Sequence, residues 1–511
     1  MNAFNGTEFL QWFKGAGGWY DEKYIGLKPF SGMGYGAVAL ESVPEDIPLF
    51  HIPDSLILSS HSSELSKHLT EEEWEKLNHG WCQLILCMMW ESERGIDSPW
   101  SGYLANMPVE FDTPMLWDED ERKELIGTDI EDRIGKEDAE QEYNETLLPI
   151  IKAHPELFPE SSQHHSLSSF HLHGSRILSR SFTVPLLRFT RLALEPQNNN
   201  DNGDDESDFS DDDDDEYEED GEEIAVMIPF ADMLNAAYER DNANLYTNEK
   251  IKKDTPWTKK GFTMKSTKLI NKDEQIYNTY ASPPNSELLR KYGHVDILPL
   301  PQELIDLLKK EDQVDGEWYY GNPGDEVLID GTAIVESVKK VLGKDKINEK
   351  WESKISKRVD WWLEEGQEDM FPLTLSPEID EALIGFIRLL LYDHEWLRAK
   401  KKNKLPTTTI DNDVAAIIVD AIQNRLSKYS GDIQSDLVVI KSIKADHIPR
   451  PSASTALPTT IEGNEEISTK QLRKCYAAIV RLGEKRILHS ALKIAEGHLP
   501  QKRKAEDDGK A

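Results

Sequence analysis

The stretch that decides the fold runs from Ile224 to Tyr292 and opens with the apolar run Ile224-Ala-Val-Met-Ile-Pro-Phe230. A short apolar run of this kind predicts a buried β-strand. The chain then places a carboxylate and an amide inside an apolar frame, in Ala231-Asp-Met-Leu-Asn235. After Asp241-Asn-Ala-Asn-Leu245, the segment Gly261-Phe-Thr-Met-Lys265 predicts another strand. The stretch therefore predicts short buried strands with polar residues between them.

The end of this stretch predicts a place where polar side chains collect. Glu274-Gln-Ile-Tyr-Asn-Thr-Tyr280 follows a turn, and Ser286–Tyr292 predicts a short helix that ends at the glycine cap Gly293. Two tyrosines and two asparagines therefore lie at the ends of short buried elements, where they could line a polar pocket. On the pattern alone, a β-rich core with capping asparagines and core tyrosines is the favoured interpretation.

Six segments, read together, resemble the SET-domain protein lysine methyltransferases. The resemblance is closest to the subgroup of Rubisco and ribosomal-protein lysine methyltransferases, and within it to the ribosomal lysine methyltransferase 4 type. Each segment alone is a weak signal, but the six occur in the family's order and cover roughly residues 5–295. They are Phe9–Phe13 with Gly17-Gly18, Gly32–Ala37, Ser179–Phe182, Ile228–Asn235, Asp241–Leu245, and Glu274–Tyr280 through Tyr292-Gly293.

The resemblance implies an α+β protein: a SET-domain β-fold with a helical insert, followed by an all-α substrate-binding domain. The patterns of residues 65–195 and of the chain after Gln302 are mainly helical, which agrees with this order. The expected boundaries are 1–65 and 179–295 for the two parts of the SET domain, 66–178 for the insert, 300–499 for the substrate-binding domain and 500–511 for a disordered tail.

The family's functional residues are implied at matching positions only. The cofactor is S-adenosylmethionine, and Tyr280 matches the catalytic tyrosine. Arg180 and Asp232 would face the protein substrate. The implied cofactor contacts are Gly32, Met33, Gly34, Phe182, Asn235, Ala236, Tyr280 and Tyr292. One departure from the pattern is Ala236, where the family usually has a histidine.

The glycine turn has two other interpretations. Gly32-x-Gly34-x-x-Ala37 could be a dinucleotide fingerprint, but that motif needs a helix to open at its last position. Here the chain reaches Glu41-Ser-Val-Pro44, which is too short and is interrupted by proline. A plain glycine turn remains open beside the cofactor interpretation, in which glycines let the backbone approach a ligand closely.

Composition excludes several classes of protein. The chain has 511 residues, enough for two or more domains, and no run of about 18 apolar residues predicts a membrane span. Its three cysteines predict neither a disulfide framework nor a four-ligand zinc site, and we expect no metal. A metal site at His164, His165, His171 and His173 is the alternative to an ordinary polar loop beside a helix.

The net charge of −37 argues against direct binding of nucleic acid and favours a basic protein partner. Residues 201–223 contain 16 Asp or Glu and no Lys or Arg, so we expect a disordered acidic loop over 197–223. The loop is either an inert solubilising segment or a mimic of nucleic acid that attracts a basic substrate. Lys502-Arg-Lys504 is a weak nuclear signal, so a nuclear location is favoured over a cytoplasmic one.

These observations predict a monomeric protein-lysine N-methyltransferase that acts on a basic protein, with a large-subunit ribosomal protein implied by the resemblance. Two alternatives stay open: a SET-fold module that binds basic proteins without catalysis, and an acidic assembly factor for such proteins. The target lysine and the number of methyl groups added are not set by the sequence.

Overall fold

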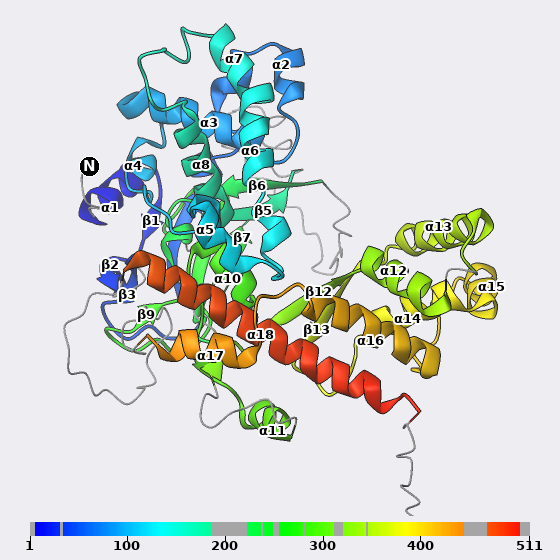
Figure 1. The fold of residues 1–511 in the computed structure, drawn as a ribbon. Helices are drawn as coiled ribbons and strands as arrows, with labels where there is room; N and C mark the ends of the chain where they lie inside the picture. The colour runs from blue at the N-terminus through cyan, green and yellow to red at the C-terminus, as the bar shows by residue number, and fades with distance from the viewer. Residues whose placement is uncertain are drawn as a thin grey trace, which may run out of the picture. The chain divides into compact units, whose positions relative to one another are not determined.

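The computed structural model describes residues 6–30, 34–186, 222–236, 239–248, 255–279, 282–310, 320–343, 346–443 and 468–500. Packing divides the chain into two compact units (Figure 1). The first unit is formed by Met1–Phe111 and Gly135–Ala281, and the second by Asp112–Ile134 and Ser282–Ala511. The chain therefore passes from the first unit to the second at Asp112, returns to the first at Gly135 and enters the second again at Ser282. The domain boundaries given by the sequence pattern stay predictions.

Three antiparallel sheets form the β-part of the first unit. The largest has the order β1-β4-β8-β7, and the second has the order β2-β3-β9. The third pairs β5 with β6, and Ser181 lies opposite Met227. The bounds are β1 Trp19–Tyr20, β2 Ile25–Phe30, β3 Gly34–Ala39, β4 Pro48–Pro53, β5 Ser181–Pro185, β6 Glu223–Met227, β7 Ala243–Asn248, β8 Gly261–Ser266 and β9 Gln275–Ile276.

The strand predicted at the start of the deciding stretch is shorter than the apolar run. It ends at Met227, two residues before Pro229, which has no N–H to donate to a sheet. The chain then turns at Phe230, and the 3-10 turn Ala231–Met233 follows. All of these residues are buried, so the apolar run continues the core after the strand has ended.

Helices cover the rest of the first unit (Figure 1). Thr70 accepts a hydrogen bond from the N–H of Glu73, and the Glu73 side chain returns one, so the predicted capping box is confirmed. The helices are α1 Gly6–Gly15, α2 Glu71–Lys76, α3 Cys82–Arg94, α4 Ser101–Leu104, α6 Lys136–Glu142, α7 Leu148–Ala153 and α8 Leu167–Arg180.

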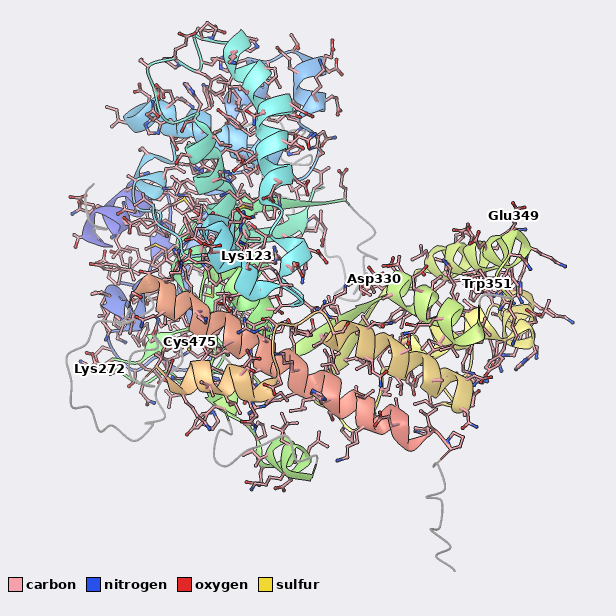
Figure 2. All side chains as sticks on the ribbon, in the orientation of Figure 1. Lys123, Lys272, Asp330, Glu349, Trp351 and Cys475 are labelled. Atoms are coloured by element: carbon pink, nitrogen blue, oxygen red, sulfur yellow. The ribbon has the colours of Figure 1, made fainter. Side chains whose placement is uncertain are left out.

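The second unit is mainly helical, but it is not wholly so. The five-residue strands β12 (Glu326–Asp330) and β13 (Met370–Thr374), which the sequence pattern did not predict, pair antiparallel. Asp330 ends β12 and caps α12 by accepting a hydrogen bond from Thr332 N–H, at the junction seen in Figure 2. The two-residue strands β10 (Leu298–Pro299) and β11 (Tyr320–Gly321) also pair.

The helices of the second unit enclose two apolar clusters, and α18 contributes to both. The helices are α5 Glu119–Arg122, α10 Asn285–Tyr292, α11 Gln302–Lys310, α12 Gly331–Leu342, α13 Glu349–Glu364, α14 Glu381–Leu391, α15 Asp393–Lys402, α16 Asn412–Leu426, α17 Ile433–Lys441 and α18 Thr469–Gly497. In the described ranges, no helix is long and apolar enough to cross a membrane.

Candidate active site

A buried carboxylate, Asp232, is held by two side chains from distant parts of the first unit. The hydroxyl of Tyr103 donates a hydrogen bond of 2.9 Å to Asp232 Oδ2. Nη1 of Arg180 lies 3.6 Å from the same oxygen and donates a hydrogen bond of 2.7 Å to the Asp232 carbonyl oxygen. The other carboxylate oxygen, Oδ1, is buried and accepts no hydrogen bond from the residues that the structure describes. Asp232 therefore keeps one acceptor for a ligand.

Burial shifts the pKa values of Asp232 and Tyr103. Loss of solvation raises the pKa of Asp232 above its ordinary value, and the positive charge of Arg180 opposes this rise. Burial also raises the pKa of Tyr103 well above its ordinary value, and the Asp232 carboxylate adds to the effect. Tyr103 therefore stays protonated and donates to Asp232. The sequence predicted Arg180 and Asp232 separately as substrate-side residues, and the structure brings their side chains together.

A strained backbone conformation at Phe230 turns the chain so that Asp232 follows closely after the end of β6. Phe230 has φ of 77°, a left-handed conformation that a side chain other than glycine rarely adopts. Its ring stacks on Phe50 at a centroid distance of 4.2 Å and meets Phe9 and Phe13 edge-on. This aromatic packing stabilises a conformation that costs of the order of 1–3 kcal/mol elsewhere. The chain thereby turns directly from β6 into the segment that presents Asp232.

Polar residues join three chain segments next to this turn. The N–H of Asn278 donates to the Asn235 carbonyl oxygen at 3.0 Å, and Ala236 forms an isolated parallel bridge with Asn278. The side chain of Asn242 accepts from Tyr277 N–H at 2.8 Å and donates to the Gln275 carbonyl oxygen at 3.0 Å. The predicted cofactor contacts Asn235 and Ala236 therefore lie where these segments meet.

Gly36 allows two amide side chains to come close to the glycine turn. A Cβ atom at Gly36 would lie 2.6 Å from Nδ2 of Asn235 and 2.7 Å from Nε2 of Gln275, which is too close for either contact. Nε2 of Gln275 is buried and makes no hydrogen bond. Gly34, in the same strand, has φ of 71° and open space where a Cβ would stand. The structure therefore leaves room for a ligand beside Gly34 and places polar groups close by.

The other predicted cofactor contacts are distributed over the chain. Phe182 lies in β5, is half-buried and packs against the core of the first unit. Tyr292 is the last residue of α10 in the second unit, followed by Gly293 with φ of 76° as the predicted cap. Gly32, Met33 and Tyr280 lie outside the described residues, so their roles stay predictions.

Sequence reasoning missed Tyr103, Asn242 and Gln275. Tyr103 lies in the helical insert, far from Asp232 in sequence, and only the fold brings their side chains together. Asn242 belonged to a segment already identified by the resemblance, but nothing in its pattern marked it as the residue that bonds to two backbone groups of another segment. Buried polar side chains must find partners, and this is the signal that could have identified it.

The four histidines near α8 make separate contacts. His165 Nε2 lies 2.7 Å from the carbonyl oxygen of Pro159, and His171 Nε2 lies 3.6 Å from a Glu140 oxygen. Burial lowers the pKa of His173 well below its ordinary value, and the charge of Arg176 lowers it further. These contacts favour the interpretation of the histidines as ordinary structural residues.

Comparisons with known proteins agree with this architecture. Residues 350–488 match the family model for the Rubisco LSMT substrate-binding domain. Ribosomal lysine N-methyltransferase 4 of Saccharomyces cerevisiae is 32% identical over 268 residues, which are 52% of this chain and 49% of that protein. N-lysine methyltransferase SETD6 of Homo sapiens is 30% identical over 274 residues, with the same two shares. The chain spans about half the length of the curated relatives it matches.

The fold is that of solved SET-domain structures. The structure of Rubisco LSMT bound to AdoMet matches with a TM-score of 0.60 at 18% identity, over 96% of this chain and 91% of that one. The SET domain of LSMT bound to lysine and AdoHcy matches with a TM-score of 0.60 at 17% identity and the same coverage. The predicted fold class and the resemblance to this subgroup are therefore confirmed.

Proposed function

We propose that this protein is a SET-type protein-lysine N-methyltransferase that uses S-adenosylmethionine and acts on a basic protein. The observation that carries the proposal is the similarity, at 30% identity or more, to two N-lysine methyltransferases. The likeness over 96% of the chain to a structure with AdoMet bound supports it at the level of the fold. The polar groups around Asp232 and Asn235 fit the binding of a substrate and a cofactor that this proposal requires.

The residues present fit the cofactor. The backbone at Gly34 is open to a ligand, and the half-buried amide of Asn235 offers both a donor and an acceptor. The buried Nε2 of Gln275 is a donor without a partner. In the proposed site, Gly32, Met33 and Gly34 bind the amino-acid end of the cofactor, Asn235 and Ala236 bind its polar groups, and Phe182 packs on it. The role of Tyr292, which belongs to the second unit, stays a prediction.

The bound cofactor supplies the methyl group. The protein must hold the substrate amine in line with that methyl group and without its proton, because only the neutral amine attacks. Desolvation in a narrow channel lowers the pKa of a lysine. The Asp232 carboxylate, with its unpaired oxygen Oδ1, orients the substrate on one side, and Arg180 fixes Asp232. The hydroxyl of Tyr280 orients the reacting groups.

The catalytic assignment is tested by replacing Tyr280 with Phe, which removes one hydroxyl and keeps the ring. We expect turnover to fall on the order of 10²-fold or more, as for other oriented donors at reacting centres. The affinity for S-adenosylmethionine should change far less, which calorimetry measures. Near wild-type turnover in this variant would show that Tyr280 is not the catalytic tyrosine.

The protein substrate is a basic protein, and we propose a large-subunit ribosomal protein. Its support is the net charge of −37 and the similarity to a ribosomal lysine N-methyltransferase. Mass spectrometry of purified ribosomal proteins incubated with enzyme and cofactor should reveal an added methyl group on one lysine. If the chain binds no S-adenosylmethionine in a calorimeter but still binds basic proteins, the non-catalytic binder or the assembly factor replaces this proposal.

We further propose that the enzyme acts as a monomer and that nuclear location is favoured. Lys502-Arg-Lys504 supports the location, and it lies outside the described residues, as does the acidic run 201–221. Light scattering of the purified chain tests the first statement, and imaging of a chain without residues 502–504 tests the second.

A further inference from the structure

Three side chains with different metal-binding donors meet in the helical insert of the first unit. They are the imidazole of His79, the thiol of Cys82 and the carboxylate of Glu142. One donor atom from each lies within 4.8 Å of the other two, and this is the one such group of three found in the described ranges. The group lies where α3 begins and α6 ends (Figure 1).

Local structure explains why the three side chains converge. The N–H of Cys82 donates to the His79 carbonyl oxygen at 3.3 Å, which closes a tight turn just before α3. Gly80, with φ of 52° and open space around it, supplies the left-handed position that this turn needs. On the other side, α6 ends at Glu142, and the next five residues form a π-helical turn, a feature that is frequent at functional sites.

One oxygen of this group is buried without a hydrogen-bond partner among the described residues. Oε1 of Glu142 is buried and makes no hydrogen bond, which a carboxylate oxygen seldom tolerates. It lies 3.3 Å from Nε2 of His79, while Nδ1 of His79 lies 3.6 Å from Sγ of Cys82. Burial, and then the neighbouring Glu142 carboxylate, raises the pKa of the Cys82 thiol to about 12. The Glu142 carboxylate therefore lies next to both the imidazole of His79 and the thiol of Cys82.

We propose that His79, Cys82 and Glu142 bind one Zn²⁺ ion, with water as the fourth ligand. Nitrogen, thiolate and carboxylate ligands bind Zn²⁺ at about 2.0–2.3 Å in a tetrahedron, so adjacent donors lie roughly 3.3–3.8 Å apart. The ring of His79 would use one of its two nitrogens, and one donor atom of each side chain lies within 4.8 Å of the other two, so the donors must move closer together to reach that spacing. A hard ion such as Mg²⁺ prefers oxygen ligands only, which excludes it.

A cavity lies beside His79, one of the three side chains. The cavity has a volume of about 570 Å³ and is lined by His79, Gly80 and Trp81, among others. His79 itself is exposed. Water can therefore reach the ion, and three protein ligands with one open position are typical of zinc sites that exchange a ligand. The ion would also join the start of α3 to the end of α6.

The release of a proton on zinc binding makes the zinc affinity depend on pH, and this dependence can be measured. Zinc binding breaks the S–H bond of Cys82, forms a Zn–S bond and releases the proton to solvent. The apparent affinity for Zn²⁺ should therefore rise by up to about tenfold per pH unit while Cys82 is a thiol in the free protein. A purely structural cluster of these three side chains predicts no such dependence.

The first experiment titrates Zn²⁺ into the full chain, without an affinity tag and stripped with a chelator. We expect one zinc per chain by calorimetry and by elemental analysis. Cys82→Ser and Glu142→Gln should each weaken binding on the order of 10-fold or more. Cys87→Ala is the matched control, because Cys87 is buried in the same helix with a pKa also raised to about 12 and is not in the group.

The second experiment is spectroscopic and uses the same cysteine variants. Co²⁺ added to the wild-type chain should give a sulfur-to-cobalt charge-transfer band, and the band should persist in Cys87→Ala and vanish in Cys82→Ser. The proposal is overturned if the wild-type chain shows no thiolate band, if it binds less than one zinc, or if Cys82→Ser binds zinc as tightly as the wild type.

Discussion

At the scale of single residues, Gly36 decides whether the proposed cofactor groups can come together. An added Cβ would lie within 2.7 Å of the amides of Asn235 and Gln275, so Gly36→Ala must displace both. We expect roughly tenfold weaker binding of S-adenosylmethionine, about 1.4 kcal/mol, measured by calorimetry. Gly15→Ala is the control, because nothing lies within 4 Å of that Cβ position. Unchanged binding in Gly36→Ala would place the cofactor elsewhere.

At the scale of elements, α18 holds the segment 112–134 through charged side chains that are buried or partly buried. Arg473 donates to Asp112 at 2.7 Å, and Arg481 donates to Asp436 at 2.8 Å while it also bonds to Glu124. Glu484 accepts from the hydroxyl of Tyr429 and from Asp129 N–H. Because a buried charge needs its partner, this helix and this segment stabilise each other.

This arrangement predicts a pH dependence of stability. Burial raises the pKa of Glu484 from 4.5 to about 8, and the nearby Asp129 adds to the rise while Arg425 opposes it. The folded state then binds a proton that the unfolded chain has lost, so this stabilisation is complete below pH 4.5 and disappears as the pH rises through about 8.

The free energy of unfolding should therefore fall by up to about 1.4 kcal/mol per pH unit across that window. Urea titrations at several pH values measure it, and Glu484→Gln should flatten the slope while it keeps an acceptor for Tyr429. Burial raises the pKa of Asp325 to about 7. Part of the pH dependence of the unfolding free energy should therefore remain in Glu484→Gln. An equal slope in both proteins would contradict the assignment to Glu484.

At the scale of the whole molecule, a single cut cannot separate the two units. Trp117, Leu125 and Ile130, all at most 1% exposed, pack in one cluster with residues of α18 such as Cys475, labelled in Figure 2. A chain that ends at Leu300 should therefore expose this apolar surface and aggregate. Replacing 112–134 by a short Gly/Ser linker in a chain that ends at Ala281 should restore solubility. Sedimentation of both products, with mass determination of the soluble fraction, checks the pair.

How much the sequence predicted depends on the range of the interactions. The capping box at Thr70 and the Gly293 cap, both present in the structure, follow from local chemistry. The place of the segment 112–134 in the second unit does not, because its partners on α18 lie more than 300 residues further on. A separation of 129 residues likewise hid the contact of Tyr103 with Asp232. β12 and β13 were not recognised because neither strand has a strong period of its own.

The excursion of residues 112–134 into the second unit has a consequence for how the protein is made. Synthesis proceeds at about 5–20 residues per second, and α18 follows this segment by about 340 residues. Roughly 20–70 s therefore pass between the synthesis of Trp117 and that of its packing partners on α18. During that time the apolar side chains of the segment face solvent or a chaperone. Slower translation after Ile134 should therefore raise the share of nascent chains that bind a holdase, whereas slower translation before Asp112 should not.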